Sequence, residues 1–387
     1  MNESVTKKVK RGLELVLPAR YYRLIRACYW GLPEFQQLYR QNYLLDQGKK
    51  KSIFLEILEV IQLTLYFQCV PIHYLSLRMY RKDFSEKLFD FIPEAALNGF
   101  RDNMNPKEAR NAVIDKKIFA RVMKRNNLPA ICDVHTISYD SSTKDDLIMS
   151  TKFEEFIKLF SDLDVKELFL KPLDGVRSIG AFQAVLNSNK LYIDQKEVNE
   201  KSFFNLLFSG KRFTCYLVQP VIRQHEVLRR INPSCVNPVR IDTLLLREQI
   251  VHNFAVLCVG NGTNSAYGGE GRLLVKIDLD TGKLAPFGKV LTTAGDRTVY
   301  AHPVSRASFA NVTLPFWSEV KALVHSAAPL LYPLRSIGWD VAITPNGPLL
   351  IEANHDQELC RFQLAAGGLA NTPMGREIFK RLRPADV

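Results

Sequence analysis

The segment Gly338–Asn354, GWDVAITPNGPLLIEAN, constrains the fold more than any other stretch of this chain. Apolar and polar residues alternate on both sides of Pro-Asn-Gly, which is the pattern of a β-hairpin with a tight turn. A two-residue turn at Asn346-Gly347 would need Pro348 to donate the N–H that closes the turn, and proline has none. The residues therefore favour a three-residue loop with Gly347 in the left-handed conformation, a register that pairs Asp340 with Glu352.

This register predicts one polar and one apolar face for the hairpin. The polar face carries Asp340, Ala342, Leu350, Glu352 and Asn354. The apolar face carries Trp339, Val341, Ile343, Leu349, Ile351 and Ala353. Asp, Glu and Asn oxygens without His or Cys suit a hard cation such as Mg²⁺, which binds one or two carboxylates together with substrate phosphates. The alternative is a solvent-facing sheet surface with incidental acids.

Helical patterns dominate the first part of the chain and strand patterns the rest. Apolar residues recur at a spacing of three to four in Ile53–Ile61, and Asn105-Pro106 interrupts the helical region. Asn105 is predicted to cap a helix, Asp115 to cap the next, and Thr151 with Glu154 to form a capping box. A helix is expected over residues 316–331. Together with the hairpin, five predicted strands indicate an α+β fold: Glu167–Lys171, Phe213–Gln219, Val239–Leu246, Ile250–Val259 and Leu273–Asp278.

The net charge of +12 is concentrated near the start of the chain. Residues 1–51 contain eleven Lys or Arg against four Asp or Glu, a net +7. This segment is either a solvated helical surface or a surface that attracts an anionic partner, such as a membrane or a charged polymer. No nucleic-acid motif accompanies the charge, so we expect no nucleic-acid partner. Scattered cysteines and the lack of a signal-peptide pattern predict a cytoplasmic protein, with peripheral contact to the inner face of the membrane as an alternative.

A metal site at the hairpin would require a phosphate donor elsewhere in the chain. Neither a P-loop nor a complete GxGxxG motif is present. A predicted strand instead ends at Lys171 and continues into a loop that contains Gly175 and Gly180. A lysine at such a position can place its ammonium group on a phosphate while backbone N–H groups of the loop cover the other oxygens. A second lysine, Lys116, follows the predicted cap Asp115.

Taken in order over about residues 105–380, these pieces resemble the ATP-grasp superfamily, and most closely its sugar-transfer-associated ATP-grasp family. The resemblance implies that Lys116 and Lys171 hold the ATP phosphates, with Lys117 as the alternative to Lys116. The segment Leu170–Gly180 is similar to the family's glycine-rich lid loop, which adds Arg177, Ser178 and Gly180 to the ATP site.

Other implied ATP contacts lie further along the chain. Val218–Val221 resembles the hinge against which adenine lies, with Gln219 where a glutamate is more usual, and Glu226 falls at the position that holds ribose. Arg240 resembles the phosphate-contacting arginine, and Asp340, Glu352 and Asn354 match the metal-binding Asp and Glu-x-Asn. The loop with Asn264, together with His355 and Asp356, is a candidate acceptor pocket.

The resemblance implies an α+β ATP-grasp fold preceded by a basic helical region at 1–104. Within the ATP-grasp part, we expect an N-terminal and lid subdomain at 105–220 and a C-terminal subdomain with the metal site at 221–387. It also implies ATP-dependent carboxylate–amine ligation through an acyl phosphate, with one or two Mg²⁺ ions or Mn²⁺ and with Arg240 and Lys171 as catalytic groups. The carboxylate is expected on a sugar or a peptide, in surface-polysaccharide or natural-product assembly. The alternatives are a kinase that phosphorylates a hydroxyl and a non-catalytic basic scaffold. The sequence leaves the oligomeric state open.

Overall fold

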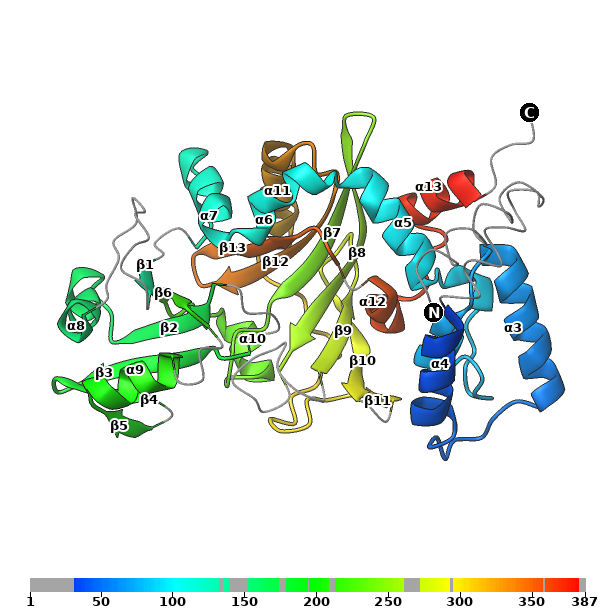
Figure 1. The fold of residues 1–387 in the computed structure, drawn as a ribbon, viewed down its shortest axis with the longest axis horizontal. Helices are drawn as coiled ribbons and strands as arrows, with labels where there is room; N and C mark the ends of the chain where they lie inside the picture. Colours follow the sequence, from blue (N-terminus) through cyan, green and yellow to red (C-terminus); the bar gives the residue numbers. More distant parts are fainter. Residues whose placement is uncertain are drawn as a thin grey trace, which may run out of the picture. The chain divides into compact units, whose positions relative to one another are not determined.

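The computed structural model describes residues 31–131, 135–138, 152–173, 179–193, 195–208, 213–260, 272–292, 295–357 and 359–382. Helices and strands are mixed in it, which confirms the predicted α+β class (Figure 1). The chain forms two compact units. The first comprises the residues up to Asn103, Leu291–Arg297 and the C-terminal segment, and the second comprises Met104–Val290 and Thr298–Gln357. Within the described ranges, every helix is too short or too polar to cross a membrane.

The first unit is built from helices of both ends of the chain. They are a π-helical turn Tyr39–Tyr43, α3 Ile53–Phe67, α4 Ile72–Ser76, a 3₁₀ turn Leu88–Asp90, α5 Glu94–Met104, α12 Leu359–Ala366 and α13 Pro373–Leu382. The side chain of Gln363 bonds both the N–H and the C=O of Ile92 at 2.9 Å, and the ring of Phe379 lies against Tyr66 and Phe67. The residues from Leu359 onward, expected in the 221–387 subdomain, therefore belong to the helical unit instead, because their apolar side chains complete its core.

The second unit contains two antiparallel sheets. The six-stranded sheet has the order β1-β6-β2-β3-β4-β5. Its strands are β1 His135–Ser138, β2 Glu167–Pro172, β3 Phe182–Asn187, β4 Lys190–Ile193, β5 Lys196–Val198 and β6 Cys215–Pro220. The seven-stranded sheet has the order β11-β10-β9-β8-β7-β12-β13. Its strands are β7 Val239–Leu246, β8 Gln249–Val259, β9 Arg272–Ile277, β10 Leu284–Thr292, β11 Gly295–Val299, β12 Ser336–Thr344 and β13 Gly347–Asn354; Leu291–Arg297, at the end of β10 and the start of β11, is counted with the first unit.

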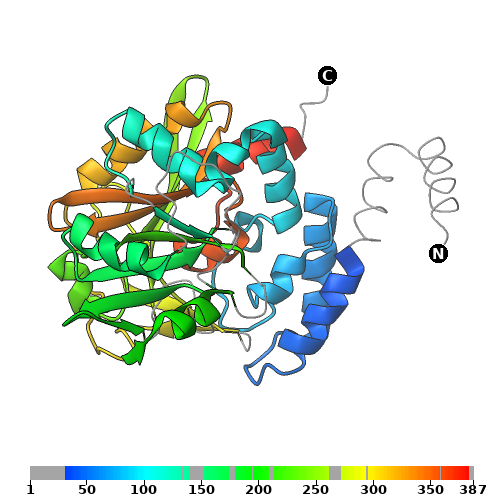
Figure 2. The ribbon, with the colours of Figure 1, turned by 60° about the vertical axis from the view of Figure 1, so that its left-hand side comes forward.

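Helices cover these sheets and close two hydrophobic cores. In the six-stranded sheet, Phe156 of α8 stacks on Phe203 of α9 with ring centroids 4.6 Å apart. In the seven-stranded sheet, the fully buried Trp339 lies in a core shared with α7 and α11. The helices of the unit are η3 Lys107–Ala109, α6 Asn111–Ile114, α7 Lys116–Arg125, α8 Phe153–Asp162, α9 Glu200–Phe208, α10 Glu226–Ile231, α11 Trp317–Ala327 and η5 Ala328–Leu331. Figure 2 shows the green strands of the first sheet beside the orange β12–β13 hairpin.

The hairpin has the predicted pairing of Asp340 with Glu352 but a different turn. Thr344 pairs with Gly347, so the loop has two residues and the predicted three-residue loop is wrong. The Thr344 hydroxyl donates to Gly347 O at 2.8 Å and accepts from Asn346 N at 3.2 Å, which stabilises this turn. Pro348 then lies opposite Ile343, next to the closing pair, where an antiparallel ladder needs no N–H from it.

A β-bulge reconciles the tight turn with the outer register. Val341 pairs with Leu350 and Asp340 with Glu352, so Ile351 is the extra residue on β13. The bulge reverses the predicted faces near the turn. Leu350 is fully buried in the core opposite Val341, whereas Leu349 is only partly buried and pairs with Ala342. The predicted polar face is thus correct for Asp340, Glu352 and Asn354 and wrong for Leu350.

Because of the bulge, alanine substitutions at Leu349 and Leu350 test which register the hairpin has. Leu350→Ala should lower the free energy of unfolding by about 2–5 kcal/mol, because it leaves a cavity in the core. Leu349→Ala should cost about 1 kcal/mol, because its side chain is only partly removed from water. Urea titrations followed by circular dichroism would measure both values. The reverse order, with Leu349 the more costly, would show that the uninterrupted register is correct.

Two predicted helix caps have different outcomes. Asp115 caps α7, since its carboxylate accepts from Lys117 N at 2.8 Å and Ile118 N at 3.3 Å. Asn105 caps no helix, and that prediction is wrong. Its buried side chain donates to Ser336 O at 2.7 Å and accepts from Arg335 N and Ser336 N at 3.0 Å, so it anchors the start of β12. The helix α8 begins at Phe153, and the predicted capping residue Thr151 lies outside the described residues.

Candidate active site

Three neighbouring strands align the principal polar side chains in a row. Asp340 on β12 pairs with Arg240 on β7 and with Glu352 on β13. One step along the strands, Gly338 pairs with Asp242 and with Asn354. Because side chains two residues apart share a face of a sheet, all five side chains lie on one face around the glycine. The opposite face is apolar and contributes to the core described above.

Arg240 and Asp340 form a buried bidentate ion pair. Arg240 Nε donates to Asp340 Oδ1 at 2.6 Å and Arg240 Nη2 donates to Oδ2 at 2.8 Å. The side chains are 7% and 1% exposed, so water screens the pair only weakly. Burial raises the pKa of Asp340 to about 6, although the guanidinium opposes the shift. The planar guanidinium fork is suited to phosphate oxygens as well as to a carboxylate.

Glu352 and Asn354 complete a convergent set of oxygen donors. Asn354 Nδ2 lies 3.4 Å from Asp340 Oδ2 and 3.3 Å from Glu352 Oε1. Burial acts to raise the pKa of Glu352, but Lys171 and then Asp340, through a hydrogen bond, hold that pKa below its ordinary value. Glu352 is therefore ionised near neutral pH. Two carboxylates and one amide thus meet at a single place on the sheet.

This donor set fits a hard divalent cation. Within the part of the chain that the structure describes, no group of three or more His, Cys, Asp or Glu is placed to hold a metal ion. An ion would depend on the carboxylates of Asp340 and Glu352, the amide of Asn354 and oxygens from a phosphate substrate. That combination is typical of Mg²⁺, which keeps several positions for water and phosphate.

The two predicted phosphate lysines approach this row from β2 and from the start of α7. Lys171 lies near the end of β2, and Lys116 is the first residue of α7. Burial lowers the pKa of Lys171, whereas the carboxylate of Glu352 acts to raise it. Lys116 Nζ donates to Leu173 O at 2.8 Å, directly after β2. The structure thus brings both lysines to the end of one strand, facing the acids.

A buried carboxylate behind the row was not predicted as a site residue. Asp242 is fully buried and accepts hydrogen bonds from Asn253 Nδ2 of β8 and, at 2.7 Å, from Gln357 Nε2. Gln357 reaches it because Gly338 has no side chain: a Cβ there would lie 2.5 Å from Gln357 Cγ. Alternation along β7 puts Asp242 on the same face as Arg240, but no sequence pattern indicated Gln357 or Asn253 as its partners.

The predicted lid loop is described only at its end. Arg177 and Ser178 lie outside the described residues, as does Asn264 of the candidate acceptor pocket. Gly180 lies just before β3 with a positive φ of 79°. A Cβ at this position would come within 2.7 Å of the Phe213 ring, so the backbone course requires glycine.

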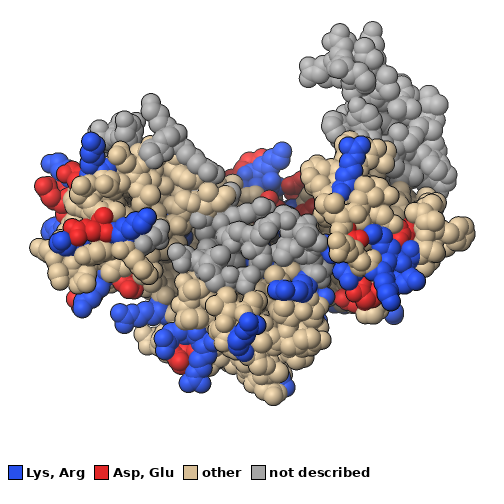
Figure 3. Space-filling model, turned by 90° about the horizontal axis from the view of Figure 1, so that it is seen from below, with Lys and Arg blue, Asp and Glu red and all other residues tan. Residues whose placement is uncertain are grey.

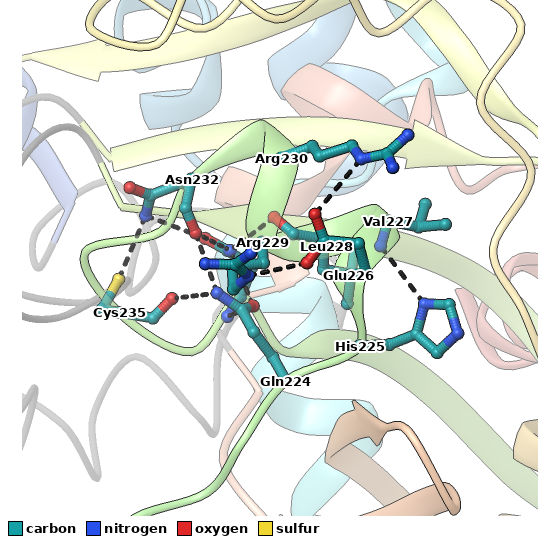
Figure 4. Close-up of polar contacts among 10 residues, drawn as sticks. Gln224, His225, Glu226, Val227, Leu228, Arg229, Arg230, Asn232 and Cys235 are labelled. Carbon is teal, nitrogen blue, oxygen red and sulfur yellow. Dashed lines mark hydrogen bonds and ion pairs between the residues drawn. The ribbon is translucent and has the colours of Figure 1, made fainter.

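The predicted hinge lies at the end of β6, and an amide network holds the segment that follows it. Gln219 is buried on β6, and Val221 follows that strand. Further along, Gln224 Nε2 donates to Asn232 O and Cys235 O at 2.8 Å (Figure 4). Asn237, which is fully buried, donates to Gln224 Oε1 at 2.9 Å. The segment after the hinge is therefore tied to the segment before β7.

Figure 4 also shows where Glu226, the predicted ribose ligand, lies. It opens α10, where His225 caps the helix through Nδ1, which accepts from Val227 N at 3.2 Å. The Glu226 side chain is exposed and pairs with Arg229 Nε at 2.7 Å and Arg230 Nε at 3.3 Å. A ribose hydroxyl would have to compete with these two arginines, and the role of Glu226 stays a prediction.

The remaining predicted acceptor residues follow β13. His355 is partly buried, and its carbonyl oxygen accepts from Asn105 Nδ2 at 3.2 Å. Asp356 is exposed. Both lie directly after the metal-binding candidates, and their contact with a substrate stays a prediction.

Several solved structures are similar to this chain. Biotin carboxylase from Campylobacter jejuni in a β-γ-ATP complex is 12% identical with a TM-score of 0.43, over 73% of this chain and 49% of that one. The ATP-grasp ligase PsnB with its minimal precursor is 13% identical with a TM-score of 0.37, over 73% and 63%. D-cycloserine synthetase DcsG is 13% identical with a TM-score of 0.41, over 75% and 79%.

The chain spans less than two thirds of the length of the first two structures, and these likenesses concern the fold alone. No curated protein matches the sequence. The family model described as sugar-transfer associated ATP-grasp matches residues 97–373, which is more than half of the chain and includes every described side chain of the candidate site. The chain belongs to the sugar-transfer associated ATP-grasp family.

Proposed function

We propose that this protein is an ATP- and Mg²⁺-dependent ligase that joins a carboxylate to an amine through an acyl phosphate. The observation that carries the proposal is the row of Arg240, Asp340 and Glu352 across three strands, with Lys171 and Lys116 close enough to act on it electrostatically. Three cationic groups and two carboxylates in one place match the needs of a triphosphate bound with its metal.

The cationic side chains have separate parts in this proposal. Lys116 and Lys171 bind phosphate oxygens of ATP, and the position of Lys171 among protein atoms limits screening by water. Arg240 stabilises the negative charge on the transferred phosphoryl group and on the acyl phosphate. Its orientation is fixed in advance by Asp340, so little reorganisation is needed during the reaction.

Asp340, Glu352 and Asn354 would hold one or two Mg²⁺ ions, and their hard oxygen donors also suit Mn²⁺. When bound, such an ion neutralises phosphate charge and orients the γ-phosphate. Gln357 and Asn253 hold the Asp242 carboxylate beneath the row and so keep the face of β7 rigid.

The proposed reaction has two substitutions. A carboxylate oxygen attacks the γ-phosphorus, the bond to the β–γ bridging oxygen breaks, and ADP leaves. The amine nitrogen then attacks the acyl carbon, the carbon–oxygen bond to phosphate breaks, and the nitrogen loses a proton. The chain has to position and stabilise charge in both steps, and neither step needs a nucleophilic side chain.

The substrate class and the location of the reaction follow from the family's association with sugar transfer. We infer a carboxylate borne on a sugar or a peptide, in surface-polysaccharide or natural-product assembly at the cytoplasmic side. Gln219, Val221, Glu226 and the lid residues would bind the nucleotide, and Asn264, His355 and Asp356 would line the acceptor pocket.

A coupled assay of the full chain tests this function. Amino acids should be screened against uronic acids and short peptides with ATP and Mg²⁺, and phosphate release should require both a carboxylate and an amine. The exposed Glu319→Gln variant should behave as the unmodified protein. ADP formation with a hydroxyl acceptor and no amine would establish a kinase instead. Absence of Mg²⁺-dependent ATP binding by calorimetry would contradict both enzymatic functions.

A further inference from the structure

Helix α3 of the first unit buries its two acids and exposes a stripe of large apolar side chains, which is unusual for a surface helix. Its two acids, Glu56 and Glu59, are buried, at 5% and 8% exposure. Leu63 and Phe67 are buried beside them, but six other large apolar residues face outward, with exposures between 42% and 78%. These residues form what we call the α3 apolar face: Ile53, Phe54, Ile57, Leu58, Ile61 and Leu65. At 100° per residue they fall within an arc of about 140°, so they form one continuous stripe.

Specific hydrogen bonds hold the acids inside the unit. Tyr43 Oη donates to Glu56 Oε2 at 2.7 Å. Tyr74 Oη donates to Glu59 Oε2 at 2.6 Å, and Lys51 Nζ donates to Glu59 Oε1 at 2.8 Å. Turning the helix to bury its apolar face would leave these buried polar groups without partners, which is costly. The outward orientation of the apolar face is therefore built into the core of the unit.

The exposed apolar surface extends beyond the helix. Leu44 and Leu45, in the segment before α3, are 58% and 73% exposed. Figure 1 shows α3 along the edge of its unit. Large contiguous apolar patches on monomeric proteins usually contact a partner or a membrane. The only polar side chain within this arc of α3 is Thr64, whose hydroxyl already bonds Val60 O at 2.7 Å, so the face is suited to a hydrocarbon surface.

The charge of the adjacent sequence indicates which hydrocarbon surface this is. Residues 1–30 contain seven Lys or Arg against two Asp or Glu, which is most of the positive excess of residues 1–51. Arg40 and Lys49, which precede α3 in the sequence, are exposed. On the face drawn in Figure 3, by contrast, basic and acidic side chains are mixed over the described surface. An apolar helical face next to a basic segment is the combination that binds anionic bilayers.

We propose that α3 lies in the surface of an anionic phospholipid bilayer, with its apolar face at the acyl-chain boundary and the exposed Arg40 and Lys49 at the headgroups. The helix is 15 residues long, or about 22 Å, which suits a helix parallel to the surface. This inference is independent of the proposed ligase activity.

Vesicle flotation of the full chain tests the proposal. The protein should float with vesicles of phosphatidylcholine mixed with phosphatidylglycerol, and less with phosphatidylcholine alone or at high salt. The double variant Ile57→Ser/Ile61→Ser should weaken partitioning at least about tenfold. Leu206→Ser/Val304→Ser makes the same chemical change at exposed residues elsewhere and should leave partitioning unchanged. Circular dichroism and thermal melting should show both variants folded, because all four residues are exposed.

A fluorescence measurement locates the helix directly. Ile57→Trp should be quenched by vesicles with brominated acyl chains, and Leu206→Trp should not be. Failure of the full chain to bind anionic vesicles, or equal binding by the Ile57→Ser/Ile61→Ser variant, would overturn the proposal. A dimer in light scattering that the same variant dissociates would assign the face to a second copy. Slow amide hydrogen exchange of α3 in a lipid-free monomer would show that other residues of this chain cover the α3 apolar face.

Discussion

Replacing Glu352 by Gln should reduce ATP turnover by at least about 100-fold while the protein stays folded. The carboxylate faces Lys171 and lies beside Asp340 and Asn354, so the variant loses a negative charge where the metal and the phosphates would bind. Glutamine keeps the size of the side chain and an oxygen acceptor for Asn354. Release of ADP in the coupled assay measures the loss, and thermal melting measures the fold. Wild-type turnover in this variant would disprove the assignment of Glu352 to the metal site.

Asp340→Asn should lose activity equally but should also destabilise the protein. The buried guanidinium of Arg240 donates to both oxygens of Asp340, and asparagine offers it only one oxygen and no charge. Removing one partner of a buried pair costs about 3–5 kcal/mol, and the retained oxygen should reduce this to about 1–3 kcal/mol. The comparison of Glu352→Gln with Asp340→Asn thus separates the charge needed for activity from the charge needed for folding. Equal melting temperatures of the two variants would contradict a stabilising role for the ion pair.

The row of polar residues could be predicted because it follows from local patterns. Alternation within each strand determines which residues share a face, and this applies equally to Arg240, Asp340 and Glu352. The exact turn could not be predicted in the same way. No residue pattern marks the bulge at Ile351. It arises because the two-residue turn closed by Thr344 and Gly347 and the pairing of β12 with β7 require registers that differ by one residue.

The supporting contacts could not be predicted because they join distant parts of the sequence. Gln357 bonds Asp242, 115 residues away, and Asn105 bonds Ser336, 231 residues away. A single polar residue in an apolar segment gives no indication of such a partner. The orientation of helix α3 could not be predicted for the same reason, because it depends on contacts distant in the sequence. Its apolar spacing predicts a helix, but only the tyrosines that bond Glu56 and Glu59 decide that the acids point inward.

Among the polar side chains of the second unit, we expect the removal of Asn237 to lower stability the most. Its Nδ2 donates to Gln224 Oε1 and to Asn232 O, both at 2.9 Å, and its Oδ1 accepts from Asn232 Nδ2 at 3.0 Å and from Gly260 N at 3.4 Å. The side chain therefore ties the segment after β6, the segment before β7 and the end of β8 together.

Asn237→Ala should lower the free energy of unfolding by about 3–5 kcal/mol, because several buried polar groups lose their partner at once. Asn237→Asp should also be destabilising, since a carboxylate cannot donate to Gln224 Oε1 or to Asn232 O. Asn346→Ala, in the exposed hairpin turn, is the matched control and should change the free energy by less than about 0.5 kcal/mol.

Urea denaturation measures these values, and calorimetric titration with ATP measures the functional consequence. Because the same network holds the segment that follows the predicted hinge, Asn237→Ala should weaken ATP binding even under conditions where the variant is folded. Asn346→Ala should leave ATP binding unchanged. An Asn237→Ala protein as stable as the wild type would show that the amide network does not hold the hinge. A destabilised variant with unchanged ATP affinity would show that the hinge is held by other contacts and that the network serves folding alone.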